Sequence, residues 1–437
     1  GGSYEGLDVI RAGRTLAVSG GTIHQNAGSL TGGAVALSNA TGNFNTTIPI
    51  GSLSLTTSTA NLTSNLSTDV TALSMTGSTL NGPITVTNPV GQTTTIIGGN
   101  FNVPLVNQGT IIIRNTTNLN GALTNASGAT LRIQSVSSTS SRLFVANGFT
   151  NEGLIEFTEQ GGTYKELHVT SGVLTNAPGG TINFAWGGYD STLGAKLDNQ
   201  GLINLYGPSL SLSKASAQHT NSGTINVTGG NFSINQSGTS PSFTNTGSIN
   251  VASGRTLFIT GGSFNTQGIL NLSGTLNSTA ANNLSSLAYF TGSSSGVFTT
   301  NTAILGKTSN HNLFASKTVT VRMTGVGPQQ LEVMSEDRGA EKSGLEDNFA
   351  YNRLELTSGT NVRLVDHSNN YTGSGAEALY VAELVVPTGA TLNLNGLKLY
   401  ARSVQVNGSI TNGTVNLLPP IADSQEFVML RNSTLPL

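Results

Sequence analysis

The sequence predicts an all-β chain folded as a parallel β-helix, a β-solenoid in which short strands stack edge to edge in successive coils. Two observations predict this fold. A phrase of the form Asn-x-(x)-Gly-x-(Ile/Leu) returns every 18 to 26 residues through the middle of the chain, and short runs of alternating apolar and polar residues accompany each copy. A unit of this length cannot bury its own apolar face, so neighbouring units must stack. We expect a right-handed coil with loop excursions and a more charged C-terminal segment.

The repeat at 243–259 illustrates the strand pattern. Ile249 and Val251 fall on one side of a short run, with polar residues between them, and Leu257 and Ile259 repeat the pattern a few residues later. Strict alternation over four to six residues is typical of half-buried strands, and the Asn-Thr-Gly and Ser-Gly breaks between the runs indicate tight turns. Each repeat is therefore predicted to contribute at least two strands.

The asparagines of the repeated phrase have two possible roles. They are Asn107, Asn125, Asn151, Asn176, Asn199, Asn221, Asn245 and Asn265. Asparagines at equivalent positions of neighbouring coils can stack as a ladder of amide hydrogen bonds. Alternatively, each asparagine only supplies the turn geometry with positive φ that Asn and Gly tolerate. The sequence leaves both roles open.

The chain divides into four segments by the regularity of its pattern and by its charge. Residues 1–100 form irregular N-terminal solenoid coils, and residues 101–276 hold the regular repeats. Residues 277–353 are weaker coils that lead into a charged loop excursion. Residues 354–437 form a C-terminal β module with a terminal strand. The stretch 331–355 alone carries 10 of the 40 charged residues, seven acidic and three basic.

Composition excludes several classes of protein. Only 9% of residues are charged and the net charge is −2, so no basic stripe exists to bind nucleic acid. No run of 18 apolar residues occurs, and no membrane span is predicted. The chain has no cysteine, which excludes disulfides and thiolate metal sites and is compatible with export. Because it opens with Gly1-Gly2-Ser3 and no signal peptide, we expect a mature or excised piece of a longer precursor.

Two stretches resemble known bacterial proteins. The phrasing of residues 243–268, Phe-Thr-Asn-x-Gly-x-Ile-Asn-Val followed by Gly-Gly-x-Phe, resembles the passenger repeats of autotransporter-type and haemagglutinin-like surface proteins. Residues 332–339, 349–356 and 377–400 resemble a module of very large secreted planctomycete-type proteins, where it precedes sorting or attachment domains. Both resemblances imply a fragment of an extracellular, surface-associated protein. Neither offers catalytic residues to carry over, and this chain ends soon after the module.

A β-helix that degrades polysaccharide is the main alternative. Such enzymes need clustered carboxylates for acid–base chemistry or for Ca²⁺. No Asp or Glu lies between Asp69 and Glu152, or between Asp198 and Glu332. We therefore predict no catalytic residues and do not expect an enzyme. The acids of the intervening segment, expected to be solvated, are Glu152, Glu156, Glu159, Glu166, Asp190 and Asp198.

The one aromatic concentration offers a possible carbohydrate-binding surface. Its candidate residues are Tyr189, Tyr206 and Trp186, since an exposed aromatic row on a flat solenoid face can stack on sugar rings. However, Trp186 shares strand parity with Ile182 and Phe184, so these three are expected to pack inside successive coils. The two tyrosines are better candidates for exposure.

The acidic run offers a possible calcium site. Glu336, Asp337, Glu346 and Asp347 are oxygen donors of the kind that Ca²⁺ prefers, but the run lacks the spacing of known calcium loops. An exposed loop is the default interpretation. We expect no other cofactor, because the five histidines have no ligand spacing.

These observations together predict an extracellular structural or adhesive protein of a bacterial surface or fibre. A solenoid exposes parallel strand edges at both ends, which must be capped or paired. We therefore expect subunits to associate end to end into a filament, with surface glycans as possible further partners. The alternative hypothesis is a carbohydrate-binding or polysaccharide-degrading β-helix.

Overall fold

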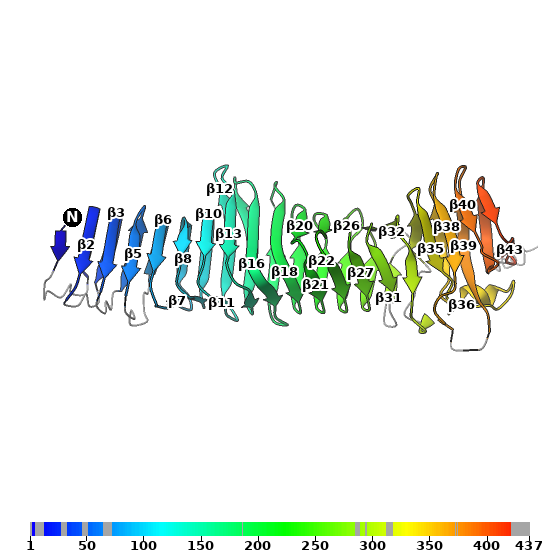
Figure 1. Ribbon diagram of the computed structural model, residues 1–437, viewed down its shortest axis with the longest axis horizontal. Coiled ribbons are helices and arrows are strands. Elements are labelled where there is room, and N and C mark those ends of the chain that lie inside the picture. The colour runs from blue at the N-terminus through cyan, green and yellow to red at the C-terminus, as the bar shows by residue number, and fades with distance from the viewer. Residues whose placement is uncertain are drawn as a thin grey trace, which may run out of the picture. The chain divides into compact units, whose positions relative to one another are not determined.

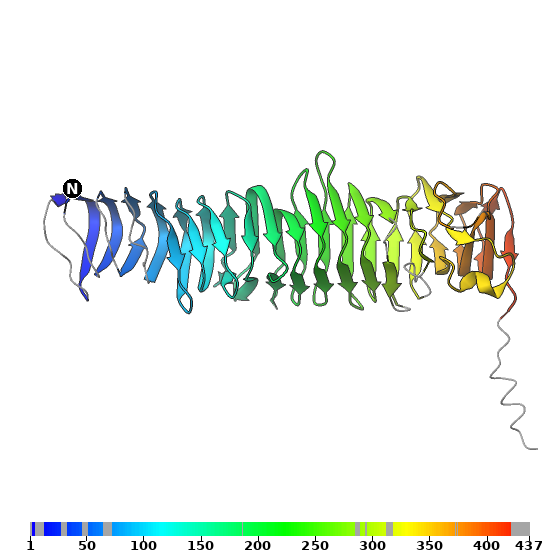
Figure 2. The same ribbon diagram turned by 90° about the horizontal axis from the view of Figure 1, so that it is seen from below.

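The computed structural model describes residues 2–4, 13–27, 33–45, 51–63, 72–185, 187–284, 289–292, 295–311, 318–371, 373 and 375–420. It confirms the predicted fold class: the described chain is all-β, and its strands pair in parallel to form a β-solenoid (Figures 1 and 2). The handedness of the coil stays a prediction. Contacts divide the chain into two units, Gly1–Asn282 and Asn283–Leu437.

The first unit has three stacks of parallel strands, because each coil turns its chain through three successive strand directions. Stack 1 consists of β2 (Thr15–Gln25), β3 (Ala34–Phe44), β4 (Ser52–Thr56), β6 (Ala72–Asn81), β8 (Thr93–Phe101), β10 (Thr110–Leu119), β12 (Thr130–Val136), β15 (Leu154–Gln160), β17 (Thr181–Phe184), β19 (Leu202–Leu205), β22 (Thr224–Val227), β25 (Ser248–Val251) and β28 (Ile269–Leu272). The second halves of β2, β3, β6, β8 and β10 continue into stack 2.

Stacks 2 and 3 complete each coil. Stack 2 also contains β1 (Gly2–Tyr4), β5 (Thr59–Leu62), β13 (Ser141–Val145), the first parts of β16 (Lys165–Asn176) and β18 (Ser191–Asn199), β20 (Leu210–Ser213), β23 (Phe232–Asn235), β26 (Thr256–Thr260) and β29 (Thr275–Ser278). Stack 3 contains β7 (Val86–Asn88), β9 (Leu105–Asn107), β11 (Leu123–Asn125), β14 (Phe149–Asn151), the last parts of β16 and β18, β21 (Gln218–Asn221), β24 (Ser242–Asn245) and β27 (Ser263–Thr266).

Inward-facing positions of the strands form continuous apolar columns. In stack 1 the register aligns Ile96, Ile113, Ile133, Phe157, Phe184, Leu205, Val227, Val251 and Leu272, all of them buried. Phe157 and Phe184 stack with ring centroids 4.4 Å apart. The parity prediction for Phe184 is therefore confirmed. Such columns bury each side chain between equivalents above and below, at roughly 25 cal/mol per Å² of apolar surface removed from water.

The motif asparagines form the predicted ladder. In stack 3, from Asn107 to Asn221, the side-chain Nδ2 of each motif asparagine donates to Oδ1 of the equivalent asparagine in the next coil, at 2.6–2.8 Å. The ladder asparagines from Asn107 to Asn245 are fully buried. Their Nδ2 atoms also donate to a backbone carbonyl of a neighbouring coil, as from Asn107 to Thr130 O at 2.9 Å. None of these asparagines is among the described residues with positive φ, so the ladder, and not turn geometry, explains them.

The membership of the ladder differs from the sequence prediction at both ends. Asn88 joins it, donating to Asn107 Oδ1 at 2.8 Å. Asn265 does not, which corrects the prediction: the register places Thr266 opposite Asn245, and Asn245 Nδ2 donates to Thr266 Oγ1 at 3.3 Å. The reason is spacing. One residue separates Asn245 from Gly247, whereas two separate Asn265 from Gly268. When these two glycines align, Thr266 takes the inward position opposite Asn245, and Asn265 is displaced from it by one residue.

The motif glycines are required for close approach between coils. A Cβ on Gly223 would lie 2.0 Å from Gly201 O, and one on Gly247 would lie 2.0 Å from Gly223 O. A Cβ on Gly268 would lie 2.1 Å from Gly247 O. Gly128, in another copy of the phrase, differs because it has positive φ and open space where its Cβ would lie. Gly223, Gly247 and Gly268 do not have positive φ. They are needed because each carbonyl occupies the space where the next glycine's side chain would begin.

The second unit continues the parallel pairing with longer loops. Its elements are β31 (Tyr289–Gly292), β32 (Val297–Thr300), β33 (Ile304–Gly306), β34 (Thr320–Met323), β35 (Pro328–Glu332), β36 (Ser335–Glu336), the 3-10 turn η2 (Lys342–Leu345), β37 (Tyr351–Leu356), β38 (Asn361–Val365), β39 (Glu377–Val386), β40 (Thr391–Asn393), β41 (Lys398–Val406), β42 (Ser409–Thr411) and β43 (Val415–Leu417), and β30 (Ala281–Leu284) lies at the division. β36 pairs antiparallel with β39, unlike the parallel pairings around it.

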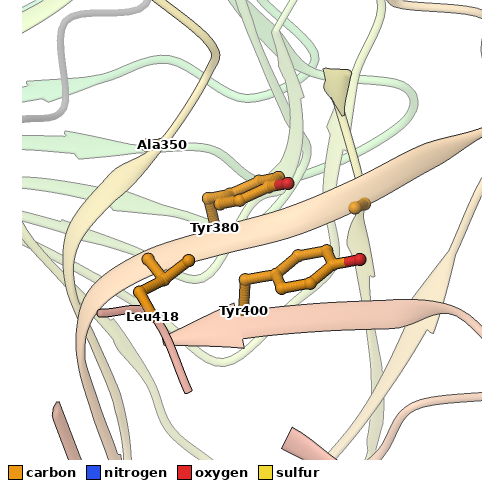
Figure 3. Packing of buried hydrophobic residues seen from close by; sticks show 5 residues of the cluster. Ala350, Tyr380, Tyr400 and Leu418 are labelled. Carbon is orange, nitrogen blue, oxygen red and sulfur yellow. The ribbon is translucent and has the colours of Figure 1, made fainter. Parts of the chain in front are cut away.

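The acidic run, residues 336–347, packs against the strands of the second unit through an aromatic cluster. Tyr380 of β39 and Tyr400 of β41 stack with centroids 4.6 Å apart, and Ala350, Ala378 and Leu418 are buried with them (Figure 3). The Tyr380 hydroxyl donates to Gly339 O at 2.7 Å and accepts from the Arg338 amide at 2.8 Å. The charged excursion is thus anchored to the coil. Among the described residues, no helix has the length and apolarity needed to cross a bilayer.

Replacing a ladder asparagine is expected to destabilise the first unit. In Asn176→Ala, Asn151 Nδ2 loses one of its acceptors, and Asn199 Oδ1 and Leu202 O lose a buried donor. We expect the free energy of unfolding in urea to fall by about 2–3 kcal/mol, the cost of leaving buried polar groups without partners. The control Asn265→Ala, outside the ladder, should cost less than about 1 kcal/mol. Equal losses in the two variants would contradict the ladder's role.

Candidate functional site

The strongest candidate site is an aromatic and charged surface where the coils widen. β12 and β15 run seven residues each, whereas the later strands of stack 1 have four. Tyr164 lies in the loop after β15, and Tyr189 lies in the loop after β17 of the next coil. Their side chains are 51% and 44% exposed, and their rings meet edge to face with centroids 5.8 Å apart. We call these residues the tyrosine pair.

A buried ion pair fixes the backbone beneath the tyrosine pair. Lys165 is only 1% exposed, and its Nζ donates to Glu159 Oε2 at 2.8 Å and to Tyr189 O at 2.7 Å. Glu159 in turn accepts from the amides of Gly188, at 2.7 Å, and Tyr189, at 3.4 Å. These contacts hold the 187–189 segment in place. The exposed ring of Tyr189 therefore projects from a rigid backbone.

We call the Glu159–Lys165 ion pair the clamp, and the pKa of its carboxyl is lowered. Burial alone would raise the pKa of Glu159, but the Lys165 ammonium and the amides of Gly188 and Tyr189 outweigh burial and hold the pKa below its usual value. Lys165 has two oxygen partners for its three N–H bonds. The clamp is satisfied within the fold and leaves no free charge for chemistry.

The outer face of β13 and β16 extends this surface with further polar and aromatic groups. Glu166 Oε1 accepts from Arg142 Nε at 2.9 Å, and its Oε2 lies 2.9 Å from His168 Nε2. The His168 ring stacks on Phe144 with centroids 4.9 Å apart. It also crosses Gly194 of the next coil, where a Cβ would lie 2.2 Å from His168 Nδ1. Burial opposes ionisation of Glu166, but His168 and Arg142 lower its pKa.

This geometry suits binding better than cleavage. Glu166 and His168 alternate outward along β16, and the exposed Tyr164 immediately precedes this strand, so an exposed ring is close in sequence to a carboxylate and guanidinium held in an ion pair. Aromatic faces with adjacent hydrogen-bonding groups are what a polar, ring-shaped ligand requires. A general acid needs a raised pKa, and both Glu159 and Glu166 have lowered pKa values.

The other acids of the enzymatic alternative also have partners. Glu156 pairs with Arg132 at 2.8 Å. Asp198 accepts from Thr220 Oγ1 at 2.6 Å and from Gln200 Nε2 at 2.7 Å. Asp190 accepts from the Ser209 amide at 3.1 Å, and Glu152 is exposed. Glu156, Asp190 and Asp198 therefore each have a hydrogen-bonding or ionic partner within the fold.

The predicted aromatic candidates have different outcomes. Tyr189 belongs to the tyrosine pair. Tyr206 is 41% exposed at the same corner one coil later, but among the described residues no ring contact joins it to Tyr189. Trp186 lies outside the described residues. Tyr164, Phe144 and His168 were not proposed for the site from sequence, although the outward parity of Phe144 in β13 and of His168 in β16 carried that signal.

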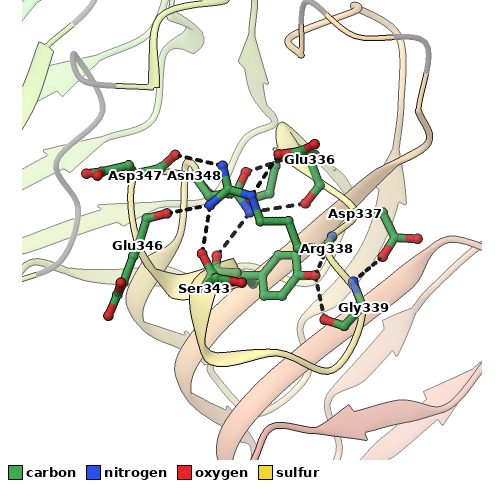
Figure 4. A network of polar contacts seen from close by, with 11 residues as sticks. Glu336, Asp337, Arg338, Gly339, Ser343, Glu346, Asp347 and Asn348 are labelled. Atoms are coloured by element: carbon green, nitrogen blue, oxygen red, sulfur yellow. Dashed lines mark hydrogen bonds and ion pairs between the residues drawn. The ribbon is translucent and has the colours of Figure 1, made fainter.

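The acidic run does not form the predicted calcium site. Arg338 occupies its centre: Nε donates to Glu336 Oε2 at 2.7 Å, and Nη1 donates to the carbonyls of Ser343 and Glu346, each at 2.8 Å (Figure 4). Asp347 likewise contributes its carbonyl, at 3.4 Å. The guanidinium lowers the pKa of Glu336, so a cation is already present where Ca²⁺ was considered.

Asp337, the remaining residue of that prediction, points elsewhere. Its Oδ2 pairs with Lys398 Nζ at 2.6 Å, and its Oδ1 accepts from the Tyr400 hydroxyl at 2.8 Å. Burial would raise the pKa of Asp337, but these two partners and the Gly339 amide lower it. Within the described ranges, no three Asp, Glu, His or Cys side chains gather as metal ligands.

Comparison with known proteins finds no match: no family model, no curated protein and no solved structure is similar to this chain.

Breaking the clamp beneath the tyrosine pair should destabilise the first unit. Glu159→Gln leaves the buried Lys165 ammonium without a counter-charge, and we expect a loss of about 3 kcal/mol in the free energy of unfolding at pH 7. The double variant Glu159→Gln/Lys165→Met removes both charges and should recover most of this loss. Urea denaturation measures both, and similar losses in the single and double variants would contradict the clamp.

The difference in the free energy of unfolding between wild type and Glu159→Gln should depend on pH. The folded pKa of Glu159 is lowered, so its contribution to stability is present above the usual value of 4.5 and is lost as pH falls through the folded pKa. The difference between wild type and Glu159→Gln should therefore shrink on acidification.

Proposed function

We propose that this protein is an extracellular structural or adhesive β-solenoid that self-associates end to end. The observation that carries the proposal is the last described coil, formed by residues 403–417. Val404 and Val406 align with Leu384 and Val386 of the preceding coil. The preceding residues are 0% exposed, whereas Val404 and Val406 are 40% and 38% exposed. Inward positions of the coil are therefore uncovered.

The backbone of this coil is also open for pairing. Among the described strands, β42 pairs with β40 and β43 pairs with β41, and no described strand covers their other edges. Leu417 is 62% exposed, although its register partner Ala401 is buried. An open parallel edge with exposed apolar positions is a template for another strand. A second copy of this chain, with coils of the same spacing and polarity, fits this edge.

Composition and sequence resemblance support an extracellular, bacterial-surface location for this assembly. The chain is rich in hydroxyl and amide side chains, has no cysteine and carries few charges, as expected of the surface and secreted proteins that it resembles. A stiff array of identical coils would act mechanically, by projecting a repeated polar surface.

Charges placed on the open coil should prevent self-association. The double variant Val406→Lys/Leu417→Lys puts two ammonium groups on the edge that a second copy would cover, whereas the control Val326→Lys changes a residue that is 87% exposed elsewhere in the second unit. We expect wild type and control to form particles longer than one chain in electron micrographs at micromolar concentration. The double variant should sediment as a monomer. Monodisperse single particles of the wild type would exclude the proposal.

A second candidate function is carbohydrate binding, which the tyrosine pair favours. Two exposed rings at an edge-to-face angle, on a backbone fixed by the Glu159–Lys165 clamp, lie next to the Arg142–Glu166 pair. Preorganised rings lose little conformational entropy when a sugar stacks on them. Because the site's acids are in ion pairs, we propose binding without cleavage.

Removing the rings should weaken this binding. Affinity electrophoresis through gels containing neutral or uronic polysaccharides measures the retardation of the native chain. Tyr164→Ala/Tyr189→Ala should weaken the retardation at least about tenfold, the effect of losing two stacking contacts, while Tyr206→Ala should leave it unchanged. If no polysaccharide retards the wild type, or if the double variant is retarded equally, the carbohydrate proposal fails.

A further inference from the structure

Two buried carboxyl groups in the second unit have no basic partner. Glu332 ends β35 and Glu377 begins β39, and they are 1% and 5% exposed. The ion pairs of the described residues do not include either one. Burying an ionised carboxyl is costly unless a charge or hydrogen bonds compensate for the lost water. The surroundings of these two groups therefore need an explanation.

Both carboxyls hold the same loop between β38 and β39. Glu332 Oε1 accepts from the amides of His367, at 2.6 Å, and Ser368, at 2.7 Å. Glu377 Oε1 accepts from the amides of Asn370 and, at 2.7 Å, Tyr371. Amides of residues 367–371 thus fix one oxygen of each carboxyl. The two carboxyl groups bind one short loop segment, and rotating either side chain away from it would break these hydrogen bonds.

Three oxygen atoms in this region are buried and unpartnered. They are Glu332 Oε2, Glu377 Oε2 and Asn370 Oδ1. Asn370 is 0% exposed, and its Nδ2 donates to Thr308 O at 2.7 Å, which fixes the orientation of the amide. All three atoms are acceptors. Buried acceptors without a hydrogen-bond partner are rare in a folded interior, and carboxylate and amide oxygens are the ligands that a hard cation prefers.

Electrostatics also favour a positive occupant. Burial raises the pKa of Glu332, and it raises the pKa of Glu377 to about 7, with the negative charges of Asp366 and Glu332 adding to the shift. The amides of the loop oppose these shifts, as does His367 for Glu332. The Tyr351 hydroxyl is close enough for the charge on Glu332 to raise its pKa further. Two carboxylates would balance the charge of one divalent cation.

We propose that Glu332 Oε2, Glu377 Oε2 and Asn370 Oδ1 are side-chain ligands of a divalent-cation site of the calcium class. The cation would join the end of β35, the start of β39 and the loop between β38 and β39. The site is distinct from the acidic run, whose centre Arg338 already occupies. It is also independent of the self-association and carbohydrate-binding proposals. With two charged ligands, an affinity in the range of extracellular calcium modules, a Kd of about 10⁻⁴–10⁻³ M, is expected.

Calcium titration of the full chain tests the site. The metal-stripped protein is titrated with CaCl₂ at pH 7.5 by calorimetry, and its thermal unfolding is followed with and without calcium. We expect about one ion per chain and a higher Tm with calcium. Glu332→Gln and Glu377→Gln should each weaken binding at least about tenfold, because each removes one of two ligand charges. The control Glu346→Gln, an exposed acid of the same unit, should bind like wild type.

The competing occupant is a proton, and the same measurements distinguish it. The folded pKa of Glu377 is raised, so a proton on it stabilises the fold below the usual pKa and this effect is lost as pH rises through about 7. If stability follows that pH profile equally with and without calcium, and no heat of calcium binding is measured, the metal proposal is wrong. Calcium affinity unchanged in both Gln variants would also overturn it.

A third variant keeps the test decisive if the Gln variants do not fold. Asn370→Asp adds a negative charge beside the two carboxyls while keeping a ligand oxygen in place. A cation site predicts a larger calcium-dependent rise in Tm for this variant than for wild type, because the added charge is neutralised only when the ion binds. A rise equal to or smaller than that of wild type contradicts the proposal.

Discussion

Parallel pairing between successive coils is the constraint on which the rest of this structure depends. Strands about 4.8 Å apart bring every residue next to its equivalent in the coils before and after. A side chain is therefore tolerated only if it can pack or bond with copies of its own kind. The buried asparagine ladder, the phenylalanine contacts at Phe157–Phe184 and Phe243–Phe264, and the stacked motif glycines are three results of this one requirement.

The same constraint determines where charges occur. Like charges repeated in register would repel one another, and the chain has few charged residues. Where they do occur, the register often places opposite charges side by side, as with Arg132 and Glu156, or Arg142 and Glu166. Such partly exposed pairs contribute little to stability. The buried Lys165, Glu332 and Glu377 are different, because removing them from water needs a specific compensating partner.

Departures from the regular coil locate the candidate sites. Columns of apolar side chains fill the inside of the solenoid, so ligands must meet its outer surface, its ends or its loop excursions. The tyrosine pair lies on the loops that follow β15 and β17 in neighbouring coils. The buried carboxyls Glu332 and Glu377 lie where the loop between β38 and β39 leaves the coil. The edge of β42 and β43, which no described strand covers, is the third such feature, and the proposal of assembly rests on it.

The sequence by itself determined the repeating architecture, because stacking imposes a period that is visible in one dimension. It also determined the inward parity of Phe184 and identified the repeated asparagines, seven of which form the ladder, although it left open whether they form a ladder or only supply turns. It could not place Asn265, since register follows the glycine contacts between coils and not the local phrase. Nor could it show that a side chain at motif positions such as Gly223 would collide with a backbone carbonyl of the neighbouring coil.

Only the tertiary structure decided which polar groups meet. The short spacing between Arg338 and Glu336 does not by itself predict that their side chains pair. In the fold, the Arg338 guanidinium inserts among the carbonyls of 343–347 and excludes the calcium site that the acidic run suggested. Glu332 and Glu377 are 45 residues apart in the sequence, and no sequence pattern connected them. In the fold, both carboxyl groups accept hydrogen bonds from amides of one loop. Periodicity fixes which residues face inward. The partners of a buried charge depend on how loops from different coils fold back, and no local pattern records that.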